Sequence, residues 1–98
     1  MRLRAEEVDA IKFAAREAFG EGVVVRLFGS RVNDQLRGGD IDLHFEVPDA
    51  RPPFRQTCRF LDLVEEPLDG RKVDALFSVR GIAPESFEAI AYRDGIVL

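Results

Sequence analysis

The stretch "DIDLHFEV", residues 40–47, alternates strictly between polar and apolar side chains. A β-strand turns successive side chains to opposite faces. The alternation therefore predicts a strand with one apolar face, made by Ile41, Leu43, Phe45 and Val47, and one polar face, made by Asp40, Asp42, His44 and Glu46. Hydrophobic burial would favour no carboxylate on such a strand. The polar face is therefore expected to stay wet or to bind a metal ion.

The segments on either side show the periodicities of helices and further strands. Apolar residues spaced by three or four positions predict helices over residues 5–19, 54–66 and 84–93. Apolar, β-branched runs predict strands over residues 23–28 and 71–79, and residues 94–98 could close as a short edge strand.

The order of these elements predicts an α+β fold, a small mixed β-sheet with helices packed on one face. The chain has 98 residues, which is the size of one domain, so residues 1–98 are expected to form a single unit. On the helices, Phe54, Cys58 and Ile90 are among the side chains expected to face inward.

Composition excludes several classes of protein. The net charge is −4 and the chain has a single cysteine. An acidic chain is not expected to bind nucleic acid nonspecifically, and one cysteine cannot form an internal disulfide, which fits a reducing cytoplasm. No secretory leader is recognisable at the start of the sequence, and no run of about 18 apolar residues predicts a membrane span.

The carboxylates have the spacing of a metal site. Asp40 and Asp42 are two residues apart, which places their Cα atoms about 6.5–7 Å apart on one face of a strand. Asp74 lies opposite the apolar side chains of the strand over residues 71–79. If the two strands are neighbours, the three carboxylates cluster, and oxygen ligands of this kind suit Mg²⁺.

A glycine and a serine stand where the first predicted strand ends. Gly29 lets a phosphate approach the backbone, and the hydroxyl of Ser30 can bind it. Arg31 follows directly and could also reach a phosphate. A phosphate-binding turn followed by two metal ligands is what metal-assisted phosphoryl transfer requires.

With these residues, "GSRVNDQLRGGDIDL" (29–43) resembles the signature of the polymerase β-type nucleotidyltransferase superfamily, and "KVDALF" (72–77) supplies a third carboxylate strand. The short length and the ending "RDGIVL" (93–98) are similar to the minimal nucleotidyltransferases. These chains are often encoded beside a HEPN-domain partner, and some act as antitoxins.

The resemblance implies a role for each matching residue. Gly29, Ser30 and Arg31 would bind the nucleoside triphosphate, ATP being the expected one. Asp40, Asp42 and Asp74 would be the catalytic and metal-binding residues, with Mg²⁺ or Mn²⁺ as the metal. Asp74 would complete the metal site or take the proton of the acceptor hydroxyl. The expected partner is a HEPN-domain or other substrate-binding protein, and a homo-oligomer remains open.

Simpler interpretations stand beside these. Asp40 and Asp42 could face solvent on an antiparallel sheet without binding anything, and Asp74 could be a solvated aspartate. His44 could be a ligand or a proton shuttle, although a residue in a cleft wall is the favoured interpretation. For the whole chain, a non-catalytic nucleotide-binding subunit, or an antitoxin that acts by binding alone, is the alternative to an enzyme.

Overall fold

The computed structural model describes residues 3–28, 41–84 and 86–98. Its elements follow the chain as α1 (Ala5–Phe19), β1 (Val24–Phe28), β2 (Ile41–Val47), α2 (Phe54–Glu65), β3 (Val73–Val79), α3 (Ser86–Asp94) and β4 (Ile96–Val97). Every predicted helix and strand is present, with small shifts at the ends. None of the helices in the described ranges has the length and apolarity needed to cross a membrane.

The four strands form one mixed sheet in the order β3-β2-β1-β4. β1 pairs in antiparallel fashion with both β2 and β4, whereas β2 and β3 run parallel. Parallel neighbours need a crossover connection, and α2 provides it. The predicted α+β fold class is therefore confirmed.

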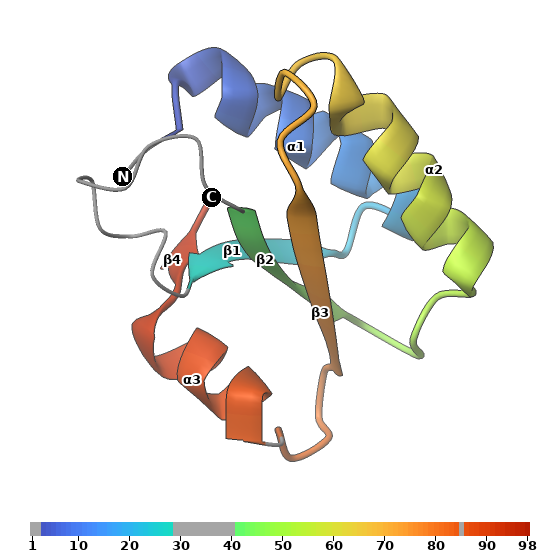
Figure 1. Ribbon diagram of the computed structural model, residues 1–98. Coiled ribbons are helices and arrows are strands. Elements are labelled where there is room, and N and C mark those ends of the chain that lie inside the picture. The colour runs from blue at the N-terminus through green and yellow to red at the C-terminus, as the bar shows by residue number, and fades with distance from the viewer. Residues whose placement is uncertain (1–2, 29–40, 85) are drawn as a thin grey trace.

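The helices form two layers around the sheet (Figure 1). α1 and α2 lie together on the apolar face, as predicted. α3 departs from the one-face arrangement, because its Glu88 and Tyr92 contact Ser78 and His44 on the polar face. Part of the face that was expected to stay wet is thus covered by a helix.

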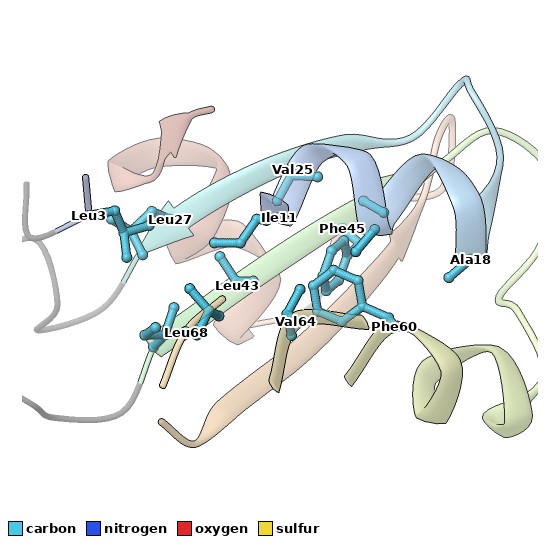
Figure 2. Packing of buried hydrophobic residues seen from close by; sticks show 13 residues of the cluster. Leu3, Ile11, Ala18, Val25, Leu27, Leu43, Phe45, Phe60, Val64 and Leu68 are labelled. Carbon is cyan, nitrogen blue, oxygen red and sulfur yellow. The ribbon is translucent and has the colours of Figure 1, made fainter. Parts of the chain in front are cut away.

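The core lies between the sheet and the α1–α2 layer (Figure 2). Phe45 of β2 is its centre, with ring centroids 4.9 Å from Phe60 of α2, 5.0 Å from Phe19 and 5.2 Å from Phe77. These four aromatic rings tie both helices to β2 and β3. Large aromatic side chains contribute the greatest apolar area to a core of this size.

Two residues expected to face inward do not. Phe54 is 78% exposed, because the buried stripe of α2 runs through Phe60 and Val64 and is rotated about a quarter of a turn from the predicted one. Ile90 is 39% exposed, because α3 turns Glu88 and Ala91 inward instead. Cys58 is half-buried rather than fully enclosed.

Candidate active site

The polar face of the sheet brings Asp42 and Asp74 side by side. The parallel register of β2 and β3 pairs these two residues. Paired residues on neighbouring strands turn their side chains to the same face, and the strands lie about 4.8 Å apart. Since Leu43 and Ala75 pack on the core side, both carboxylates point to the opposite face. The condition for the predicted carboxylate cluster, that these two strands are neighbours, is therefore met.

This end of the polar face is open to water. Asp42 is half-buried, and the side chain of Asp74 is 50% exposed. The ammonium nitrogen of Lys72 lies 3.7 Å from Asp74 Oδ1. β1 also ends here, because Phe28 is the partner of Asp42 in the antiparallel pairing. An incoming molecule can therefore reach Asp74 without displacing any of the helices that the structure describes.

The other predicted site residues, Gly29, Ser30, Arg31 and Asp40, lie outside the described residues. Phe28 and Ile41, the described residues that precede and follow that segment in the chain, both stand at the carboxylate end of the sheet. The roles of the four residues remain predictions.

The two described carboxylates suit a hard divalent cation. Mg²⁺ and Mn²⁺ prefer oxygen ligands, and two carboxylates this close repel each other unless a cation or a proton lies between them. Among the residues that the structure describes, no group of three acidic, histidine or cysteine side chains could hold a metal ion. The structure thus brings together two of the three carboxylates of the predicted metal site, and metal binding by them remains a prediction.

The far end of the same polar face is closed. His44, two residues beyond Asp42, is fully buried, and Ser78 on β3 is 1% exposed. Tyr92 of α3 packs edge-on against the His44 ring at a centroid distance of 4.9 Å. The prediction that His44 lines a cleft is wrong, because α3 excludes water from this position.

A chain of hydrogen bonds crosses this closed end. Ser78 donates its hydroxyl proton to Glu88 Oε1 at 2.7 Å, and His44 Nε2 lies 2.8 Å from the same hydroxyl oxygen. Ser78 therefore accepts from His44, which fixes the proton of the imidazole on Nε2. Burial lowers the pKa of His44, the Arg26 guanidinium lowers it further, and the carboxylates of Glu46 and Glu88 only partly oppose them. His44 is consequently neutral at pH 7.

The arginines on this face are bound to Glu46. Arg80 donates to one carboxylate oxygen of Glu46 at 2.7 Å and Arg26 donates to the other at 2.9 Å. The hydrogen bond from Arg80 is the main cause of the lowered pKa of Glu46, although burial alone would raise it. Arg26 also lies over the Tyr92 ring, 4.6 Å from its centroid. Both guanidinium groups thus have structural partners.

A second ion pair positions the start of β3. Arg71, the residue before Lys72, binds Glu7 of α1, and Glu7 also accepts a hydrogen bond from the Arg4 amide at 2.8 Å. Burial would raise the pKa of Glu7, but the Arg4 amide and the Arg71 guanidinium together hold it below its usual value. The entry to β3, and with it the position of Asp74, is thereby attached to α1.

Sequence reasoning missed the polar cluster beneath α3. Ser78 lies four residues after Asp74, which places both side chains on the same face of β3. Glu88 and Tyr92 are four residues apart, the spacing that places two side chains on one helix face. These signals were present, but each is also common on solvated surfaces, so only the packing of α3 identifies the cluster.

Comparison with known proteins is consistent with this geometry. A family model described as a nucleotidyltransferase domain matches residues 8–97. The matched span contains all four strands, including both carboxylate-bearing ones. No curated protein matches the chain significantly.

Proposed function

The chain belongs to the nucleotidyltransferase domain family, and on that premise we propose that it transfers AMP from ATP to a hydroxyl group. One observation carries the proposal: Asp42 and Asp74 are direct partners at the water-exposed end of the polar face. Like charges opposite each other destabilise a sheet. A strand pair that served only as scaffold has no need of two like charges at paired positions.

We propose that Asp42 and Asp74, together with Asp40, hold Mg²⁺ or Mn²⁺. When bound, the cation offsets negative charge on the triphosphate and on the departing pyrophosphate. Gly29, Ser30 and Arg31 are proposed to hold the phosphates. Their support is the family signature in the sequence, and the position of Phe28 at the carboxylate end of the sheet is compatible with it.

In the proposed reaction, the acceptor oxygen attacks the α-phosphorus of ATP. A new bond forms between that oxygen and phosphorus, the bond from the α-phosphorus to the bridging oxygen breaks, and pyrophosphate leaves with the electron pair. The half-exposed carboxylate of Asp74 accepts the proton of the attacking hydroxyl. Asp42 is less exposed, and its proposed part is to bind the metal rather than to meet the acceptor.

We propose that the acceptor hydroxyl belongs to a partner protein of the HEPN type, which would make this chain the antitoxin of a pair. The support is the resemblance to minimal nucleotidyltransferases, together with the exposure of Asp74. A hydroxyl carried on another molecule can approach that carboxylate while α3 stays in place.

The test is label transfer from ATP labelled at the α-phosphate to a co-purified partner. Asp42→Asn removes one ligand charge with almost no change of shape. Loss of a residue that only supports a metal ligand typically lowers activity about 10–100-fold. Loss of a direct ligand should lower transfer by more than that. Asp9→Asn on the exposed surface of α1 is the matched control and should transfer at the parent rate.

Circular dichroism must show that both variants are folded. Full transfer activity in folded Asp42→Asn would contradict the proposed site. If the parent chain neutralises a toxic partner but transfers no label, the protein acts by binding alone.

A further inference from the structure

Lys72 places a positive charge beside the candidate metal site. It precedes β3 directly, and its ammonium lies 3.7 Å from Asp74 Oδ1, so both side chains occupy the polar face. Its side chain is 69% exposed. Its backbone is held, because the Ile41 amide donates to the Lys72 carbonyl oxygen at 2.9 Å. The residue thus combines an anchored backbone with a side chain free to change partner.

The arginines on the polar face, Arg26 and Arg80, and Arg71 at the start of β3 lack that freedom. Arg26 and Arg80 contact Glu46 at 2.9 and 2.7 Å, and Arg71 is bound to the buried carboxylate of Glu7. Each of these contacts supports the packing of a helix or a strand. Lys72, in contrast, contacts Asp74 across a distance longer than the about 3.2 Å of a well-formed hydrogen bond.

The contact between Lys72 and Asp74 is of the exchangeable kind. Ion pairs between exposed side chains are weak, because water screens them and two long side chains must be ordered. A divalent cation bound by Asp74 competes with the lysine for the same carboxylate. Lys72 would then be released within reach of a phosphate held at the same site, because its ammonium already lies 3.7 Å from Asp74 Oδ1.

We propose that Lys72 is a phosphate-binding residue: it leaves Asp74 and binds a phosphate of the nucleotide when the metal binds to Asp74. This inference rests on the proposed function, and it adds a residue to which the resemblance assigns no role. A flexible ammonium suits this role, because it is a compact charge that can follow a phosphate through several positions.

If this exchange occurs, a single substitution of Lys72 should strengthen the binding of the metal alone and weaken the binding of the nucleotide. Lys72→Met removes the positive charge that competes at Asp74, so Mn²⁺ alone should bind about 2- to 5-fold more tightly. The same change removes a contact to phosphate. The Mn²⁺ complex of a nonhydrolysable ATP analogue should therefore bind about 10-fold or more weakly.

The chain contains only two lysines, Lys12 and Lys72, which provides a matched control. Lys12 lies on α1 beside Val97 and Leu98, on the other side of the sheet from Asp74. Lys12→Met should change neither affinity. Lys72→Arg keeps the charge and should restore most of the nucleotide affinity. Calorimetry measures nucleotide binding, electron paramagnetic resonance measures free Mn²⁺, and circular dichroism checks that each variant is folded.

Lysine labelling followed by mass spectrometry is a second readout that needs no variant. Mn²⁺ alone should raise the reactivity of Lys72, because it releases the ammonium from Asp74. Mn²⁺ with the ATP analogue should lower it, and Lys12 should react equally in all three states.

The outcomes separate this inference from its premise. If the parent chain binds the analogue with Mn²⁺ while Lys72→Met leaves both affinities unchanged, or weakens both, the exchange is wrong and the proposed function stands. If the parent binds neither Mn²⁺ nor the analogue, the proposed function fails and the role of Lys72 fails with it.

Discussion

The two ends of the sheet's polar face are formed by the same two strands, β2 and β3, but one end exposes its polar groups to water and the other buries them. At one end Asp42 and Asp74 lie side by side and reach water. At the other end His44 and Ser78 are fully enclosed and hydrogen-bonded in a chain that ends on Glu88. The difference arises from what covers each end, since α3 packs over the second and leaves the first exposed.

We therefore expect residues at the closed end to contribute to stability and residues at the open end to function, although the two ends are only a few residues apart. Removing the partner of a buried polar group costs the full desolvation free energy of that group, whereas breaking an exposed ion pair costs little stability. Changes at the closed end should therefore be seen in unfolding, and changes at the open end in binding and transfer. The following predictions test that division, from the largest expected effect to the smallest.

The largest effect on stability is expected for His44→Ala. The substitution leaves a cavity against Tyr92 and removes the hydrogen-bond partner of Ser78. We expect the free energy of unfolding to fall by about 2–4 kcal/mol. Urea denaturation measures it, with Asp74→Ala at the open end, where the side chain is 50% exposed, as the control that should change much less. Equal losses for the two variants would contradict the division into a closed and an open end.

An intermediate effect is expected on the pH dependence of stability. His44 is the only histidine, and burial followed by the charge of Arg26 lowers its pKa below the ordinary value of 6.5. Below pH 6.5 the unfolded chain takes up a proton that the folded chain resists, so acid favours unfolding. The contribution is fully present above pH 6.5 and is lost as pH falls through the lowered pKa.

Urea denaturation at several pH values between about 5.5 and 7.5 tests this prediction. The carboxylates of Glu7 and Glu46 do not interfere in this range, because their pKa values are lowered below 4.5. His44→Leu removes the titrating group and should flatten the dependence in that range. An unchanged slope would show that the imidazole is protonated equally in the folded and unfolded chains.

The smallest effect on stability is expected for Asp74→Asn. It removes the exposed contact to Lys72 and also the repulsion from Asp42, and these two changes oppose each other. The free energy of unfolding should shift by less than about 0.5 kcal/mol, while label transfer is lost. A thermal melt of parent and variant side by side provides the measurement. A loss of several kilocalories would mean that Asp74 is a structural residue.

Much of the fold could be predicted because it follows local periodicity. The alternation in β2 identified its buried face, and the three- and four-residue spacings identified α1, α2 and α3. Where prediction failed, the local pattern was ambiguous. Phe54 and Val64 both suit an apolar stripe of α2, and only the position of the sheet decides that the stripe runs through Phe60 and Val64.

The amino-acid sequence by itself determined which side chains share a face of each strand. The period of two puts Asp42 and His44 on one strand face, because backbone geometry alone sets that direction. Only the tertiary structure decided that Asp74 is the partner of Asp42, and that α3 buries His44 while leaving Asp42 half-buried. Strand pairing and helix docking join residues more than thirty positions apart, so they depend on the whole core and leave no periodic signal in any short stretch of chain.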